Sequence, residues 1–245
     1  MKRPVEFWSD RLSQPTARRH LSLSARVYES LFEAILGGKV RPGEHLAEQP
    51  IAGSLGVSRI SVREAIRRLA TDGLVEIIPN RGAYVVDFSP ADIEEIFSLR
   101  GSLEALGIRL ATESAGRIDL ARLEEVVDEM RGIEKGDDRL AGAEVDTKFH
   151  HTLMEISRHR RALEAWRSMS AQITIAVYNS ITYYPDIDGL AERHSRIVDV
   201  IRSGDTEEAE SCISDHIIQG GRMLLEAIGR DSLVERERRP RRNAP

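Results

Sequence analysis

Residues 44–86 contain the pattern that most restricts the fold of this chain: two short amphipathic stretches separated by one glycine, then two β-rich runs. Apolar residues recur at three- and four-residue spacing in each stretch, which predicts two helices with one buried stripe apiece. Gly56 lies between them, where a sharp turn needs the left-handed backbone conformation that glycine adopts without steric cost. Ser58 follows as the expected N-cap of the second helix. The pattern therefore predicts a helix-turn-helix.

The second helix of this motif is short and basic, with hydroxyl groups at its N-terminus. Such a helix fits the major groove of DNA, where it contacts base edges and phosphates. The runs 74–78 and 83–86 flank the turn 79–82 and predict a hairpin, or wing, that can lay an arginine against the DNA backbone. A solvated basic helix pair is the alternative, but it leaves the ordered turn, cap and wing unexplained. The candidate DNA-binding residues are Ser58, Arg59, Ser61, Arg63, Arg67, Arg81 and Gly82.

Composition indicates a two-domain helical protein whose charge is unevenly distributed. The chain has 245 residues and a formal net charge of −5 at pH 7. Residues 1–90 hold 13 Lys or Arg against 10 Asp or Glu, whereas residues 91–245 hold 22 against 30. DNA binding needs a local basic surface rather than a basic chain. The single cysteine, Cys212, excludes an intramolecular disulfide. No run approaches the ~18 apolar residues of a membrane span, and no export signal is visible, so we expect a cytoplasmic protein without membrane contact.

Turn and cap signals divide the chain into four parts. We expect a mobile arm over 1–22, a winged helix-turn-helix domain over 23–88, an all-helical domain over 89–229 and a disordered tail over 230–245. The predicted helices are 23–38 and then 90–115, 119–135, 138–157, 160–184, 187–203 and 205–228, with breaks at Gly116, Gly136-Asp137, Pro185 and Gly204. The expected fold class is mainly α, with one small β hairpin and an antiparallel C-terminal bundle of about six helices.

Four side chains in the second half could bind a metal ion. Asp146 and His150 lie four residues apart on one predicted helix and so share a face. His194 and His216 fall on the last two predicted helices. Imidazole and carboxylate suit a divalent transition metal, with Zn²⁺ as the first candidate and Ni²⁺, Mn²⁺ or Fe²⁺ as alternatives. Spacing alone leaves the usual alternative open, which is a set of structural hydrogen bonds.

The helix-turn-helix and wing also resemble the N-terminal domain of GntR-family transcriptional regulators. The matching residues are Leu55-Gly56-Val57-Ser58-Arg59, Val62-Arg63-Glu64-Ala65-Ile66, Leu69, Asp72-Gly73-Leu74-Val75 and Arg81-Gly82-Ala83. The resemblance implies that Arg59, Ser61 and Arg63 contact operator DNA, with assistance from Ser58 and the wing. Pro50 departs from the pattern but is tolerated in the first turn of a helix.

The second half resembles the FCD-type C-terminal domain of the FadR branch of that family. The resemblance rests on Asp146-x-x-Phe149-His150, His194-x-x-Ile197, Gly204-Asp205 and His216. It implies that Asp146 and the three histidines bind a metal beneath an effector pocket, and that Arg100 contributes to this pocket. A surface pair between Arg100 and Glu104 is the alternative. Tyr178 and Asn179 interrupt an apolar run and are further candidate effector contacts. Arg158-His159 departs from the Gly-Asn pair that is common in such domains.

These features predict a homodimeric transcriptional regulator, by default a repressor. It would bind double-stranded operator DNA of matching two-fold symmetry and respond to a small carboxylate effector. A constitutive DNA-binding dimer with a structural metal is one alternative. A metal-dependent hydrolase or lyase is another, but no second motif supplies the general base that such catalysis needs.

Overall fold

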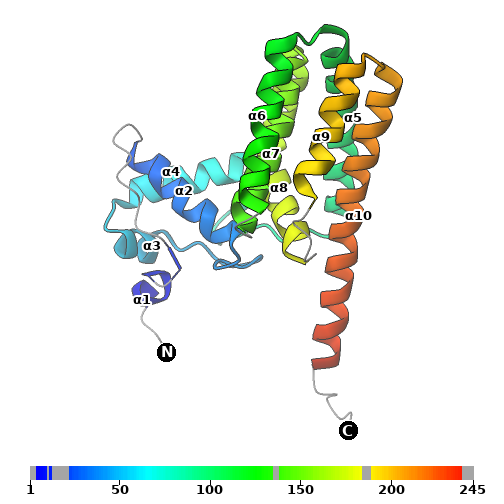
Figure 1. Ribbon diagram of the computed structural model, residues 1–245. Coiled ribbons are helices and arrows are strands. Elements are labelled where there is room, and N and C mark those ends of the chain that lie inside the picture. The colour runs from blue at the N-terminus through cyan, green and yellow to red at the C-terminus, as the bar shows by residue number, and fades with distance from the viewer. Residues whose placement is uncertain (1–3, 10, 13–21, 135–137, 184–188, 239–245) are drawn as a thin grey trace. The chain divides into compact units, whose positions relative to one another are not determined.

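The computed structural model describes residues 4–9, 11–12, 22–134, 138–183 and 189–238 (Figure 1). The described part holds ten helices and one two-stranded antiparallel sheet. This arrangement confirms the predicted mainly helical fold class with one small hairpin. The chain divides into two compact units, Met1–Phe88 and Ser89–Pro245.

The first unit contains the predicted helix-turn-helix. Its elements are α1 (Pro4–Ser9), α2 (Leu23–Leu36), α3 (Glu48–Leu55), α4 (Arg59–Thr71), β1 (Val75–Ile78) and β2 (Gly82–Val85). Helix α4 packs against both α2 and α3. Gly56 ends α3 with φ 66°, and its N–H donates to the Ala52 carbonyl. Ser58 caps α4 by accepting a hydrogen bond from the Ser61 N–H at 3.1 Å. Glycine and serine therefore form the turn as the sequence predicts.

The wing is held in place by a close approach at its tip. Strands β1 and β2 pair in register from Val75↔Val85 to Ile78↔Gly82. His45, which precedes α3, forms an isolated bridge with Tyr84. Gly82 has φ 109°, and a Cβ atom there would lie 2.4 Å from His45 Nε2. The positive φ favours glycine at this position, and any side chain there would also displace the His45 ring.

The second unit is a bundle of six described helices, as predicted. They are α5 (Pro90–Ser114), α6 (Arg117–Glu134), α7 (Arg139–Ile156), α8 (Arg160–Tyr183), α9 (Leu190–Ser203) and α10 (Thr206–Arg238). A capping box between Ser89 and Asp92 begins α5, in agreement with the predicted helix start. Helix α5 lies along α10, and α7 packs against α6 and α8 (Figure 1). Phe149, Leu153 and Trp166 are fully buried in this bundle.

Two expectations about the chain ends differ from the structure. Within the predicted arm, α1 packs against α3, and Trp8 and Leu12 are buried. The prolines and arginines of this segment obscured its helical pattern, but its apolar residues are sufficient to pack a short helix against α3. At the other end, α10 continues to Arg238 instead of ending near residue 228. Glu and Arg are good helix formers, so this charged run extends the helix.

Some sequence predictions lie outside the described residues. These are the arm over 13–21, the breaks at 136–137 and 185, and the last part of the tail, 239–245. No helix in the described ranges is both long and apolar enough to cross a membrane.

Two glycine-to-alanine substitutions should change stability in opposite directions. Gly56→Ala should lower the free energy of unfolding of the first unit by about 1–2 kcal/mol, because the left-handed conformation crowds a Cβ atom. Gly132→Ala should raise that of the second unit by about 0.5–1 kcal/mol, because this exposed helical glycine has nothing within 4 Å of an added Cβ. Urea unfolding of the full chain, followed by circular dichroism and by Trp8 and Trp166 fluorescence, measures both effects. Equal destabilisation in the two variants would contradict the backbone argument.

Candidate metal centre and nucleic-acid interface

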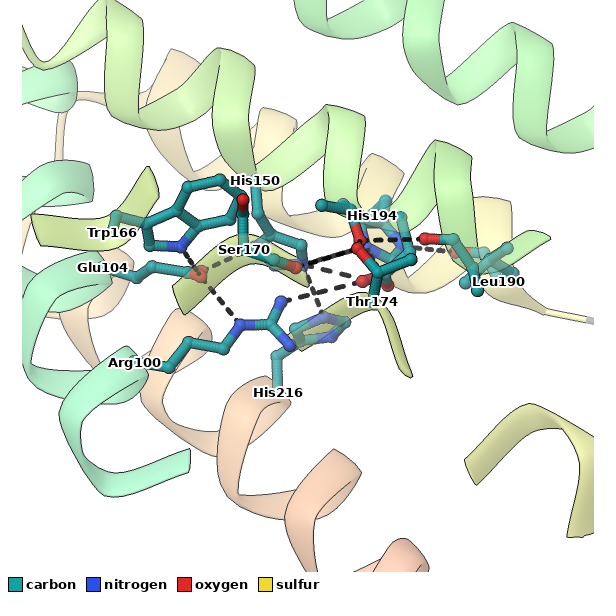
Figure 2. Close-up of polar contacts among 12 residues, drawn as sticks. Arg100, Glu104, His150, Trp166, Ser170, Thr174, Leu190, His194 and His216 are labelled. Carbon is teal, nitrogen blue, oxygen red and sulfur yellow. Dashed lines mark hydrogen bonds and ion pairs between the residues drawn. The ribbon is translucent and has the colours of Figure 1, made fainter. Parts of the chain in front are cut away.

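Four predicted ligands converge inside the helical bundle (Figure 2). Asp146 and His150 lie on α7, His194 on α9 and His216 on α10, and their candidate ligand atoms all lie within 4.8 Å of one another. The Nε2 atom of His150 is 3.3 Å from that of His194 and 3.2 Å from that of His216. Asp146 Oδ1 is 3.2 Å from His194 Nε2. The fold therefore brings together residues that are 70 positions apart in the sequence.

In two of these rings the Nδ1 atom, which faces away from the cluster, lies next to a hydrogen-bond acceptor. His150 Nδ1 lies 2.6 Å from Glu104 Oε2, and His194 Nδ1 lies 2.8 Å from the Leu190 carbonyl oxygen. A carboxylate or a carbonyl oxygen only accepts hydrogen bonds, so each Nδ1 carries the proton and donates it. In a neutral ring the Nε2 atom is then a bare acceptor. Both Nε2 atoms point into the cluster.

Burial lowers the pKa of two of the rings, whereas neighbouring groups outweigh burial at the two carboxylates and lower theirs. Burial lowers the pKa of His150, and it lowers that of His216 well below the ordinary value with help from the neighbouring His194 ring. Burial alone would raise the pKa of Glu104, but the Arg100 guanidinium and the His150 ring outweigh it and hold that pKa at about 2. The pKa of Asp146 is lowered as well, because the His150 and His194 rings outweigh its burial.

This donor set fits a divalent transition metal. Bare imidazole nitrogens and a carboxylate oxygen repel one another at 3.2–3.3 Å unless a metal cation or a shared proton lies between them. A tetrahedral metal with bonds of ~2.0–2.1 Å separates its ligand atoms by about 3.3–3.4 Å. Within the described residues, the buried Asp146 Oδ2 atom also lacks a hydrogen-bond partner. The spacing, the ring tautomers and the unpartnered oxygen are all compatible with a metal held by Asp146, His150, His194 and His216.

Arg100 lies beside this cluster rather than on the surface. Its Nε donates to Glu104 Oε1 at 2.8 Å, so the pair that the sequence offered as an alternative exists. The residue is 2% exposed, however, and its Nη2 atom is 3.7 Å from Asp146 Oδ2. That separation is too long for a hydrogen bond. In the part of the chain that the structure describes, this buried Nη2 atom has no hydrogen-bond partner.

The two other candidate effector residues are less closely defined. Tyr178 lies half-buried on α8, and Asn179 lies on the same helix near its C-terminus. The side chain of Asn179 falls outside the described part. Neither residue belongs to the group of four converging ligands.

Two groups beside the cluster, Glu104 and Trp166, were not predicted to lie there. Glu104 is fully buried, and the indole Nε1 of Trp166 donates to its Oε1 atom at 2.8 Å. The buried face of α5 also includes Ile93, Phe97 and Ile108. Helical periodicity therefore places Glu104 among apolar residues, and this was the available signal. A carboxylate on such a face needs a buried partner.

Four of the seven predicted DNA-binding residues line one groove in the first unit. This groove of about 460 Å³ lies between α3, α4 and the wing, and Arg59, Arg63, Arg67 and Gly82 contribute to it. Arg81 is exposed in the hairpin turn next to Gly82. Ser58 and Ser61 lie at the N-terminus of α4. Three cationic side chains thus share a concave surface formed by the helix-turn-helix and its wing.

Glu48 on α3 is a second residue that the sequence analysis missed. It binds Arg63 at two points, with Nε to Oε1 at 2.8 Å and Nη2 to Oε2 at 2.7 Å. Arg59 Nη2 lies 3.5 Å from the same carboxylate. The Arg63 hydrogen bonds lower the pKa of Glu48, although its burial opposes this shift. Arg59 and Arg63, in the first half of α4, therefore have an internal carboxylate partner in the free protein.

Comparison with known proteins assigns a family model to each unit. The family described as "Bacterial regulatory proteins, gntR family" matches residues 23–85. The model described as "FCD domain" matches residues 95–219, which is about half of the chain.

Similar proteins span most of the chain. The probable D-xylose utilization operon transcriptional repressor of Paenarthrobacter nicotinovorans is 29% identical over 216 residues, which cover 87% of this chain and 91% of that protein. The HTH-type transcriptional repressor RspR of Escherichia coli (strain K12) is 27% identical over 198 residues, covering 80% and 86%. The crystal structure of a protein described as a transcriptional regulator GntR from Rhodococcus sp. RHA1 has a TM-score of 0.71 and 28% identity, covering 84% and 99%.

Proposed function

The chain belongs to the GntR family of bacterial regulatory proteins and carries an FCD domain, and from this premise we propose that a small carboxylate bound at a metal centre controls its operator affinity. The family and the similar proteins are transcriptional regulators. The chain is accordingly a DNA-binding regulator and not an enzyme. The metal, the effector, the dimer and the sense of regulation are the parts that we propose.

The groove of the first unit is the proposed DNA-reading surface. Helix α4 would enter the major groove, with Arg59, Ser61 and Arg63 near base edges and phosphates. The cap at Ser58 fixes the start of this helix, and Arg67 and the wing residues Arg81 and Gly82 would contact the backbone. The groove collects these cationic groups although the chain as a whole is acidic. Operator binding of this kind places the protein in the cytoplasm with the chromosome.

The metal would be held by Asp146, His150, His194 and His216. When bound, it supplies a Lewis-acidic positive charge at the centre of the bundle. Zn²⁺ suits the three imidazoles and one carboxylate best, with Ni²⁺, Mn²⁺ or Fe²⁺ as alternatives. The two fixed Nδ1–H groups support this assignment, because metal-binding histidines usually donate their other ring N–H to a carboxylate or a carbonyl.

The observation that carries the effector proposal is the buried Nη2 atom of Arg100, which has no hydrogen-bond partner among the described residues. A buried guanidinium edge without a hydrogen bond is costly, and it lies next to the proposed metal ligands. A carboxylate matches the fork of hydrogen-bond donors on arginine. We therefore propose a small organic acid that contacts Arg100, with Tyr178 and Asn179 as candidate further contacts.

Charge balance indicates how many negative charges this ligand brings. Asp146 and Glu104 are ionised and Arg100 is cationic, so these buried groups have one excess negative charge. A divalent cation turns this into one excess positive charge. One further carboxylate would neutralise the centre, which favours a ligand that presents a single carboxylate to it.

Regulation would follow from coupling between the two units. A homodimer would match a two-fold symmetric operator, and the acid would change DNA affinity through a coupling of about 1–3 kcal/mol. Two similar proteins are named repressors, so we propose repression that the acid relieves. A constitutive DNA-binding dimer with a structural metal is the alternative, since the two unpartnered atoms also lie within ion-pair distance of each other.

Removal of one recognition arginine should weaken operator binding selectively. Arg63→Ala should reduce affinity for an operator, recovered by selection from random DNA with the wild-type protein, by about 1–3 kcal/mol. Fluorescence anisotropy at fixed salt measures this change. Arg109→Ala, which removes an equal charge from the second unit, is the matched control. Equal affinities of all three proteins would remove α4 from the DNA interface.

Protein purified without chelator should contain close to one equivalent of a transition metal per chain. Elemental analysis should show loss of this metal in the His150→Ala/His194→Ala double variant, because two of four ligands are missing. His151→Ala should keep the metal, since this neighbouring residue contacts Arg167 rather than the cluster. If the wild-type protein takes up no metal even after reconstitution, the four residues are structural.

Small monocarboxylates should raise the melting temperature of the metal-loaded protein, because they bind only the native state. Differential scanning fluorimetry with a panel of such acids and their amides tests this expectation. Arg100→Lys should reduce the affinity for an active acid at least tenfold, since an ammonium group lacks the planar fork. An amide that acts as well as its acid would contradict carboxylate recognition, and a panel without any shift would favour the constitutive alternative.

A further inference from the structure

Among the described residues of the second unit Glu104 is the most completely buried acid, and both of its oxygens accept hydrogen bonds (Figure 2). Oε1 accepts from Arg100 Nε at 2.8 Å and from Trp166 Nε1 at 2.8 Å. Oε2 accepts from His150 Nδ1 at 2.6 Å. One side chain on α5 thus joins α7 and α8 to the arginine next to the cluster. Family resemblance did not identify it, and it is not a ligand in the proposed metal centre.

The three donors define what the residue at this position must be. Arg100 and Trp166 can only donate hydrogen bonds at these atoms, and the Nδ1 atom of His150 must donate if its Nε2 atom is to bind a metal. A carboxylate accepts from all three. A glutamine could still accept at Oε1, but its amide NH₂ would face His150 Nδ1. The ring would then have to accept at Nδ1 and carry its proton on Nε2, where the metal would bind.

We propose that Glu104 is a positioning residue that sets the metal-binding tautomer of His150 and, through its other oxygen, the orientation of Arg100. This inference rests on the proposed metal centre and effector site, and adds to them the residue that connects the two. Trp166 supports it by fixing the Oε1 atom. The indole N–H has no acceptor function, so it cannot compete for the proton of His150.

The shared carboxylate has a thermodynamic consequence. A metal bound to His150 strengthens the hydrogen bond that Nδ1 donates to Glu104 Oε2. An acid bound to Arg100 changes the hydrogen bond that Arg100 donates to Oε1 of the same carboxylate. Binding of metal and of acid are then linked, and the effect of each on the affinity of the other is the same factor by reciprocity.

The test is Glu104→Gln in the full-length protein, with Zn²⁺ as the probe. Zn²⁺ affinity, measured by competition with a chromophoric chelator, should fall 10–100-fold, as is typical when the partner of a ligating histidine is lost. Glu155→Gln, an ion-paired acid on the same helix as His150, should leave affinity unchanged. In the metal-free protein, ¹⁵N shifts of the His150 ring should change from the Nδ1–H to the Nε2–H form. A purely structural Glu104 would lower thermal stability but move neither readout.

Trp166→Phe is a second variant that tests the same inference if Glu104→Gln does not fold. This variant keeps a large apolar ring and removes only the N–H donor, so Zn²⁺ affinity should fall severalfold while the circular dichroism spectrum stays that of the wild type. Zn²⁺ affinity equal to the wild type in a folded Glu104→Gln variant would overturn the inference, as would an unchanged tautomer. If Glu104→Gln does not fold, equal affinity in folded Trp166→Phe overturns it.

Measuring Zn²⁺ binding by the wild-type protein distinguishes failure of this inference from failure of the proposed function. Stoichiometric Zn²⁺ in the wild type together with unchanged Zn²⁺ affinity in the variants overturns the role of Glu104 alone and leaves the metal centre intact. Absence of Zn²⁺ binding by the wild type overturns both.

Discussion

The helical unit depends on one electrostatic constraint: two carboxylates are ionised in a core that excludes water. Glu104 is balanced by Arg100 and three hydrogen bonds, whereas Asp146 faces the His150 and His194 rings and, among the described residues, has one oxygen without a hydrogen bond. Leaving a buried charge uncompensated costs several kcal/mol. Five helices, α5 and α7 to α10, contribute polar groups to this region, although the surrounding core is apolar. The need for compensating charge therefore explains why these groups occur together, and it connects fold stability with the proposed ligand chemistry.

Sequence periodicity predicted the parts of this arrangement in which the interacting residues lie close together in the chain. The turn at Gly56 and the cap at Ser58 depend on local backbone geometry, and the shared face of Asp146 and His150 follows from their spacing on one helix. Such features need no knowledge of tertiary structure. The mainly helical class and the wing were predictable for the same reason.

Contacts between helices were not predictable from spacing. Glu104 meets His150 across 46 residues and Trp166 across 62, and no local pattern sets these pairings. Their places on the last two predicted helices made His194 and His216 candidate ligands, and the family resemblance strengthened this, but only the folded bundle brings their rings together. The packing of α1 through Trp8 is a similar case. The sequence of this segment shows no clear apolar pattern, and the burial of Trp8 depends on its contact with α3.

The ion pair between Glu48 and Arg63 changes how DNA binding by the first unit would depend on salt. An exposed arginine that meets a phosphate releases a counterion from the DNA, which is why affinity falls as salt rises. Arg63 instead already has a protein carboxylate, bound at two points. Moving it to DNA exchanges one anion for another and leaves Glu48 to attract a cation from solution. Counting one released ion for each arginine at the interface would therefore overestimate the net number, because the cation taken up by Glu48 offsets part of the release.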